Sequence, residues 1–146
     1  MRKRALFNDN WQFSAQKLSL DAPDNLFEPI TLPHTNTLFP HNNVDNEAYQ
    51  FVSTYRKKFF WRQPLENDPS LVFLDFDGVM LACEVYVNGR FLQQHLGGYA
   101  PFSIDITDQL QDGENCLTLH VDSRERQDIP PYGHLVDYLT FGGIYR

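Results

Sequence analysis

Apolar and polar residues alternate along much of this chain, and the alternation predicts strands. In residues 117–121 leucine and valine alternate with threonine and histidine, and in residues 102–106 phenylalanine and isoleucine alternate with serine and aspartate. A period of two is typical of a strand with one face buried and the other in solvent. Since His120 falls on the polar side of its run, we expect its imidazole to lie in solvent.

Two further runs predict strands of a different kind. Residues 51–61 are β-branched and aromatic around a basic centre at residues 56–58, and we expect one strand there. Residues 71–76 are apolar on both sides of the run, which is typical of a central strand covered on both faces.

Turn signals separate these runs. Asn88-Gly89 lies between two apolar stretches and predicts a hairpin with a type I′ turn, which needs a positive φ at both central residues. Residues 108–112 predict a single helical turn that ends at Gly113.

Two stretches, residues 32–46 and 124–133, show neither period and predict long loops. Loops of this length on a strand scaffold often carry function. Several short strands with turns between them, in 146 residues, predict an all-β fold formed as one domain, a β-sandwich or jelly roll.

The net charge of the chain limits the kinds of partner that it can bind. The chain has 12 lysines and arginines against 19 aspartates and glutamates, a formal net charge of −7. Binding to a nucleic-acid backbone depends on neutralising phosphates with lysine and arginine. We therefore expect no nucleic-acid partner.

Composition also bears on the compartment. No stretch approaches the roughly 20 apolar residues of a membrane span, and the basic residues 2–4 are followed by a polar segment rather than the apolar core of a signal peptide. Cys83 and Cys116 both lie in strand-like runs. We expect two reduced thiols buried in the core, no membrane contact and a cytoplasmic location.

The search for reactive groups yields one motif. The histidines and cysteines lack the spacing of a metal site, so we assign no metal ligands. Asp75 and Asp77-Gly78 follow an apolar run, and this resembles the first motif of haloacid-dehalogenase-like phosphatases, with Asp75 as nucleophile and Asp77 as acid/base. That fold needs parallel strands joined by helices, whereas a further strand and a hairpin follow here. An Asp-Gly turn between strands is the alternative interpretation.

Several short motifs follow one another in a fixed order along the chain. They are Asn10-Trp11-Gln12-Phe13, Leu32-Pro33-His34-Thr35, Tyr55-Arg56-Lys57, Phe76-Asp77-Gly78-Val79, Val85-Tyr86-Val87-Asn88-Gly89, His95-Leu96-Gly97-Gly98-Tyr99-Ala100-Pro101-Phe102, Asp105-Ile106-Thr107, Gly113-Glu114-Asn115 and Gly142-Gly143-Ile144-Tyr145-Arg146. This ordered set resembles the N-terminal sugar-binding domain of family 2 glycoside hydrolases, such as β-galactosidases and β-glucuronidases. One departure is Asn36, which stands where the family frequently has tryptophan.

The resemblance implies a galactose-binding-domain-like jelly roll, followed in the whole enzyme by an immunoglobulin-like domain and a TIM barrel. The two catalytic glutamates of this retaining β-glycosidase would lie on the barrel, so the resemblance implies no catalytic residue within residues 1–146. We expect the last strand of the domain to lie beyond Arg146. The sheet edge left open would favour pairing with a second copy, hence a homo-oligomer.

The resemblance also implies a substrate-binding residue. Asp137 matches an aspartate on a loop that reaches the barrel, where its carboxylate accepts hydrogen bonds from sugar hydroxyls. Tyr138, Asn43 and Asp45 are further candidates for contact with the β-glycoside substrate. No cofactor is implied for this chain, and a monovalent or divalent cation in the whole enzyme stays open.

The same resemblance implies structural roles at two other places. Tyr99, Pro101 and Phe102 would form a rigid turn with an aromatic wedge, and Arg146 would pin a loop through its guanidinium. The main alternative in function is an autonomous carbohydrate-binding module. That alternative predicts measurable sugar affinity in the isolated domain.

Overall fold

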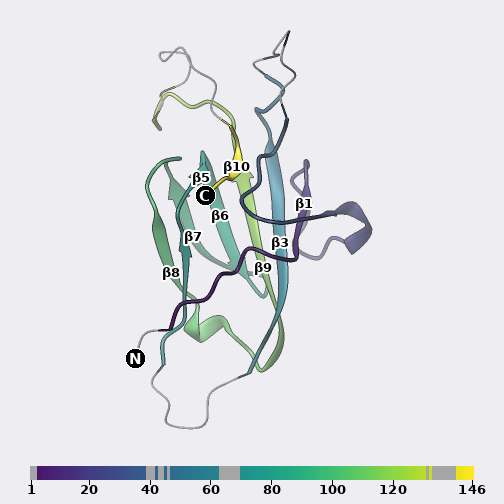
Figure 1. The fold of residues 1–146 in the computed structure, drawn as a ribbon, viewed down its shortest axis with the longest axis vertical. Coiled ribbons are helices and arrows are strands. Elements are labelled where there is room, and N and C mark those ends of the chain that lie inside the picture. Colours follow the sequence, from purple (N-terminus) through teal and green to yellow (C-terminus); the bar gives the residue numbers. More distant parts are fainter. Residues whose placement is uncertain are drawn as a thin grey trace.

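The computed structural model describes residues 3–38, 42, 45, 47–62, 70–130, 132 and 141–146. These residues form an antiparallel β-sandwich of one large sheet facing shorter strand pairs (Figure 1). The large sheet has the strand order β2-β1-β3-β9-β6-β7. Its strands are β1 (Trp11–Ser14), β2 (Glu28–Ile30), β3 (Val52–Trp61), β6 (Ala82–Val87), β7 (Arg90–Leu96) and β9 (Gly113–Asp122).

Two antiparallel strand pairs form the facing layer. The first joins β4 (Phe73–Phe76) to β8 (Phe102–Asp105), and the second joins β5 (Val79–Met80) to β10 (Gly143–Ile144). The helices in the described part of the chain are single 3-10 turns, η1 (Asp24–Leu26) and η2 (Thr107–Gln109), and neither could cross a bilayer. The predicted all-β sandwich is therefore confirmed.

The β6–β7 hairpin forms where the sequence predicts it. Asn88 and Gly89 have φ values of +50° and +80°, the signs that a type I′ turn requires. The Asn88 side chain also fixes the neighbouring turn, because its amide donates to Gln109 O at 2.8 Å and its carbonyl accepts from Cys116 N at 2.9 Å.

The predicted helical turn is present as η2, but it covers Thr107–Gln109 and its C-cap is Leu110, so the predicted range of 108–112 is wrong. Gly113, with a φ of +101°, begins β9 and does not end the helical turn.

The core lies between the large sheet and the strand pairs. Phe13, Tyr55 and Leu119 from the large sheet meet Phe76 and Ile144 from the facing layer, all of them buried. Burying apolar area contributes roughly 25 cal/mol per Å², so this contact layer is the main stabilising term of the fold.

The outer face of the large sheet is covered as well, which the period-two pattern does not predict. The segment before β2 lies over it: Thr54 donates to Gln16 O at 2.8 Å and accepts from Leu18 N at 2.9 Å. His120 is 7% exposed, with its Nε2 2.9 Å from Leu18 O. The expectation of a solvated His120 is therefore wrong, because strand periodicity reports the face of a strand and not what packs on that face.

The expectation of a central strand at residues 71–76 is also wrong. The strand is β4, and among the described residues it pairs with β8. Leu71 is 65% exposed and Phe73 50% exposed, so the run has an open outer face.

The two cysteines are free thiols, as predicted. Cys83 is buried in the core, and burial raises its thiol pKa to about 12, with the backbone of His95 opposing this shift. Cys116 is only partly buried, so its placement in the core is not confirmed.

Arg56 fastens the covering segment to the sheet. Its side chain is almost fully buried and donates to Ala22 O at 2.6 Å, Gln12 Oε1 at 2.9 Å and Asp24 Oδ1 at 2.5 Å. The guanidinium carbon lies 3.7 Å from the centroid of the Phe27 ring. One buried cation thus satisfies acceptors on β1 and on the segment before β2.

We predict that Arg56→Met destabilises the domain by about 1–3 kcal/mol, because buried acceptors such as Ala22 O lose their donor. Lys58→Met is the matched control, since Lys58 reaches the same Asp24 from the exposed side and should matter little. Urea unfolding measures both, and equal losses in the two variants would contradict the role given to Arg56.

Candidate functional site

The two long loops leave the same end of the sandwich. In Figure 1 the connection between β2 and β3 and the connection between β9 and β10 both rise from the end where β10 lies. Described parts of the two loops are bonded to each other: Ser123 N donates to Phe51 O at 3.1 Å, and Tyr49 Oη donates to Glu125 Oε1 at 2.6 Å. The described residues of 32–46 and 124–133 lie outside strands and helices, as predicted. That the two connections are bonded to each other, at residues 49–51 and 123–125, is a finding of the structure.

Asn36 is the hub at the base of these loops. It is 6% exposed, and its amide donates to Tyr49 O at 3.0 Å and to Ser123 Oγ at 2.7 Å. Its backbone N donates to Gly142 O at 2.9 Å. The Ser123 hydroxyl has Tyr49 O at 2.6 Å and Phe51 O at 2.9 Å as acceptors. A polar network therefore fills the place for which the family motif favours tryptophan.

Gly142 and Gly143 allow the backbone to pass close to the residues of this network. Gly143 has a φ of +114°, and a Cβ built on it would lie 2.6 Å from Tyr55 Oη and 2.7 Å from His34 O. A Cβ on Gly142 would lie 2.5 Å from both Asn36 Nδ2 and Ser123 Cβ. Only glycine fits such close approaches. The adjacent backbone is held by His34 N, which donates to Ile144 O at 2.8 Å.

His34 and Tyr55, which lie against Gly143, both have shifted pKa values. Burial raises the pKa of Tyr55 above its usual value, against a hydrogen bond with the Ile144 backbone, so the phenol stays protonated. Burial lowers the pKa of His34, and the charge of Glu28 opposes the shift. With His34 Nδ1 2.9 Å from Tyr55 Oη, a neutral imidazole accepts the phenol proton.

Tyr145 and Arg146 bind the loops at residues 77–78 and 98–99. Tyr145 Oη donates to Gly98 O at 2.6 Å, and Gly78 N donates to Arg146 O at 3.0 Å. The Arg146 guanidinium donates to Asp77 O at 3.0 Å and to Tyr99 O at 3.4 Å. The prediction that Arg146 pins a loop is confirmed.

The predicted aromatic wedge is Phe102. Its ring stacks on Phe76 at a centroid distance of 5.0 Å and on His95 at 4.0 Å. Tyr99 and Pro101, in the same turn, are exposed. The wedge is therefore Phe102, while Tyr99 contributes to the turn through its carbonyl, which accepts from Arg146.

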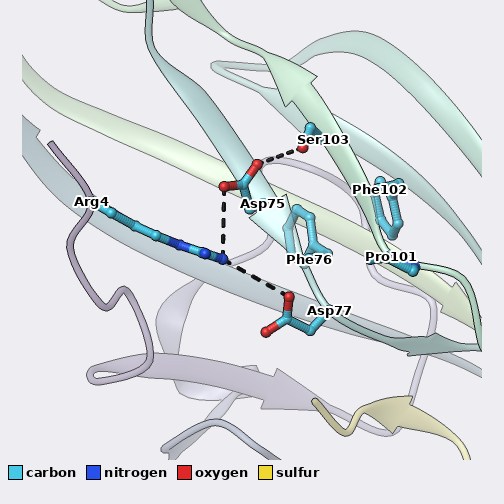
Figure 2. Close-up of a pocket in the computed structure, with 7 residues that line it drawn as sticks. All are labelled: Arg4, Asp75, Phe76, Asp77, Pro101, Phe102 and Ser103. Atoms are coloured by element: carbon cyan, nitrogen blue, oxygen red, sulfur yellow. Dashed lines mark hydrogen bonds and ion pairs between the residues drawn. The ribbon is translucent and has the colours of Figure 1, made fainter. Parts of the chain in front are cut away.

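Asp75 and Asp77 line a separate pocket of about 320 Å³ beside β4 and β8. Figure 2 shows Arg4 reaching both carboxylates, 3.8 Å from Asp75 Oδ2 and 4.0 Å from Asp77 Oδ1, while Ser103 Oγ donates to Asp75 Oδ1 at 2.5 Å. β4 is antiparallel to β8, and Asp77-Gly78 is the turn into β5, which confirms the Asp-Gly turn. The parallel sheet and crossover helices that a phosphatase of this kind needs do not follow β4, so that alternative has no support.

The predicted site residues are placed only in part. Asn43, Asp137 and Tyr138 lie outside the described residues. Asp45 is exposed, and its Oδ1 accepts from Glu47 N at 2.9 Å while its O accepts from Ala48 N at 3.1 Å, so it caps a turn. Its contact with sugar stays a prediction. Among the described residues there is no group of three or more metal-ligating side chains.

Sequence reasoning missed Asn36, Tyr49 and Ser123, which organise the base of the loops. Neither strand period nor a reactive motif marks them. The sequence offered one signal for this network, the Gly142-Gly143 pair. Paired glycines indicate that the backbone approaches other atoms closely, but they do not show which residues it approaches.

Comparison with known proteins now gives the family. Residues 33–133 match the family model of the glycosyl hydrolase 2 galactose-binding domain-like domains. The chain belongs to this family. The fold is accordingly a galactose-binding-like β-sandwich, and the resemblance inferred from the motifs is confirmed.

Relatives of this family 2 domain are much longer than the chain. It is 45% identical to a β-galactosidase of Thermoanaerobacter pseudethanolicus, over 96% of this chain and 19% of that protein. It is 42% identical to a β-galactosidase of Thermoanaerobacterium thermosulfurigenes, over 100% of the chain and 21% of that protein. The chain thus spans about a fifth of the length of the curated relatives it matches.

Solved structures agree. A putative β-galactosidase from Bacteroides fragilis superposes with a TM-score of 0.78 at 31% identity, over 97% of this chain and 22% of that chain. A β-glucuronidase from Bacteroides uniformis superposes with a TM-score of 0.76 at 31% identity, over 96% of this chain and 16% of that chain.

We predict that Gly143→Ala destabilises the family 2 domain more than Gly113→Ala. Both positions have positive φ and share a strain of about 1–3 kcal/mol. A Cβ at Gly113 meets nothing within 4 Å, whereas one at Gly143 meets Tyr55 and His34, which adds at least about 1 kcal/mol. Denaturant unfolding of the two variants measures the loss of unfolding free energy in each. Equal losses would show that the close approach at Gly143 does not contribute to the destabilisation.

The His34 shift predicts a pH dependence. Because its pKa is lower in the folded chain than the usual 6.5, the unfolded chain binds more protons below that pH. The contribution of His34 to stability is therefore complete above pH 6.5 and falls as the pH drops below it. We expect the free energy of unfolding to fall less between pH 7 and pH 5 in His34→Gln, which keeps an acceptor for Tyr55. Parallel pH profiles of the two proteins would refute this.

Proposed function

We propose that this chain is the non-catalytic N-terminal domain of a retaining family 2 β-glycosidase of the β-galactosidase type, and that it completes the sugar subsite with Asp137. The observation that supports this most is that the chain matches about a fifth of each of two β-galactosidases. The O-glycosidic bond would be cleaved by the rest of the enzyme, on the TIM barrel that the family resemblance implies.

The fixed ends of the Asp137 loop support its role. On one side Ile129 is buried against Met80, Leu81 and Ala82, and its O accepts from Tyr132 N at 2.8 Å. On the other side Gly142 O accepts from Asn36 N. A segment with anchored ends loses less conformational entropy when it binds a substrate than a free one does.

The chemistry assigned to Asp137 is recognition and not bond cleavage. An ionised carboxylate is an acceptor with two oxygens, so it can take two hydrogen bonds from vicinal sugar hydroxyls. Such charge-assisted bonds orient the ring relative to catalytic groups on another domain. Tyr138, Asn43 and Asp45 are proposed as its neighbours at the substrate.

We further propose a cytoplasmic location and a β-glycoside substrate bound jointly with the barrel. The two free thiols support the location, since exported proteins commonly pair their cysteines.

The direct test is Asp137→Ala in the full-length enzyme that carries this domain. Losing hydrogen bonds to a charged group costs about 1.5–3 kcal/mol, so we expect kcat/KM on nitrophenyl β-galactoside to fall by about 10- to 150-fold. Asp137→Asn, which keeps one acceptor, should fall less. Asp128→Ala is the control, because Asp128 is exposed and pairs with Arg126.

Two outcomes would contradict the proposal. Unchanged kinetics of Asp137→Ala would remove Asp137 from the subsite. Hydrolysis of the same substrate by residues 1–146 alone would show that the domain is itself catalytic.

A further inference from the structure

The turn of the β6–β7 hairpin carries the only Asn-Gly pair of the sequence, Asn88-Gly89. In such a pair the backbone nitrogen of the glycine can attack the side-chain carbonyl carbon of the asparagine, because glycine has no Cβ to obstruct the approach. The Cγ–Nδ2 bond then breaks, ammonia leaves and a succinimide ring forms. Water opens the ring at either of its carbonyl carbons and leaves aspartate or isoaspartate. The net change is the uptake of water and the loss of ammonia, with no oxidation or reduction.

Solvent can reach the reacting atoms of this pair. Gly89 is exposed and Asn88 is half-buried. A Cβ built on Gly89 would meet nothing within 4 Å. Water and base therefore have access to the Gly89 nitrogen, and any protection of the pair must come from the groups that hold the Asn88 side chain.

Hydrogen bonds hold the Asn88 amide in the folded chain. Its Nδ2 donates to Gln109 O and to Asn115 Oδ1, each at 2.8 Å, and its Oδ1 accepts from Cys116 N at 2.9 Å. Both amide hydrogens are thus in use. The carbonyl carbon cannot turn toward the Gly89 nitrogen until these bonds break.

Asn115 completes this arrangement from the other side. It is 1% exposed, and its Oδ1 also accepts from Gln111 N at 2.9 Å. Its Nδ2 donates to Gln111 O at 2.8 Å and to Gly113 O at 3.1 Å. The Asn88–Asn115 pair therefore ties the hairpin to the chain just before and at the start of β9, at the end of the sandwich opposite β10 (Figure 1).

We propose that Asn88-Gly89 is a site of spontaneous deamidation, and that the Asn88–Asn115 pair protects it for as long as these hydrogen bonds persist. The reaction then occurs only when this end of the sandwich opens. The site shares no residue with the Asp137 loop, so the proposal goes beyond the proposed function and does not depend on it.

Deamidation would prevent the same contacts from forming again. An ionised carboxylate can only accept, so the product at position 88 could not donate to Gln109 O or to Asn115 Oδ1. Acceptors that lose their donor in a buried place destabilise a fold. Each opening that leads to reaction therefore removes a domain from the folded population in one direction.

The first test compares the folded and the unfolded 146-residue chain. Both are incubated at the same mildly alkaline pH, without and with guanidinium chloride, and peptide mass mapping follows the conversion of Asn88 to aspartate and isoaspartate. Because local opening is rare in a hydrogen-bonded region, we expect conversion in the folded chain to be at least about tenfold slower. Equal rates would overturn the proposal.

The second test removes the protecting partner. In Asn115→Ala, which leaves Asn88 and Gly89 in place, we expect conversion in the folded chain to be about tenfold faster than in wild type. Asn36→Ala is the matched control, since Asn36 is also a buried asparagine with two donated hydrogen bonds but contacts the loops near β10. Equal acceleration in both variants, or none in Asn115→Ala, would contradict the role of the pair.

The third test uses Asn88→Asp, which reproduces one product of the reaction. Asp-Gly favours the same type I′ turn, so a change reports the hydrogen bonds and not the turn. We expect unfolding at a lower guanidinium chloride concentration than in wild type, and an unchanged midpoint would overturn the predicted consequence. This measurement and the wild-type rates decide the case even where Asn115→Ala does not fold.

Discussion

The structure depends on the passage of the Gly142-Gly143 backbone through a space that admits no side chain. Tyr55 and His34 close one side of this space, and Asn36 with Ser123 closes the other. The residues that follow then pair with β5 and bond to the loops at Gly78, Gly98 and Tyr99. Because residues 142–146 contact the large sheet, the facing layer and the loops at Gly78 and Gly98, this short segment joins the two layers of the sandwich.

Buried polar residues hold the covering segment on the outer face of the large sheet. Arg56, Thr54 and His120 point away from the core and are nonetheless buried, since the segment before β2 brings carbonyl oxygens onto them. Buried polar groups stabilise a fold only when they are paired. The pairing is complete for Arg56 and Thr54, while His120 keeps Nδ1 unpaired beside Glu84.

Much of the fold was predictable from local signals. Period two located β8 and β9, Asn88-Gly89 located the hairpin, and the ordered motifs indicated the family. The failures were long-range. The environment of His120 depends on a segment about 100 residues earlier in the chain, and the exposure of Phe73 depends on what lies over β4. Asn36 departs from the family motif, and its network with Ser123 joins residues 87 positions apart. No local pattern encodes such contacts.

We propose that this domain supplies a carboxylate to the sugar subsite of the whole enzyme. A crystal structure of the full-length enzyme with a bound galactoside analogue tests it most directly. The account predicts an oxygen of Asp137 within about 3 Å of a sugar hydroxyl, with Gly142 O still bonded to Asn36 N at the base of the loop. A bound sugar with Asp137 turned toward solvent, or with the subsite closed by barrel residues alone, would contradict it.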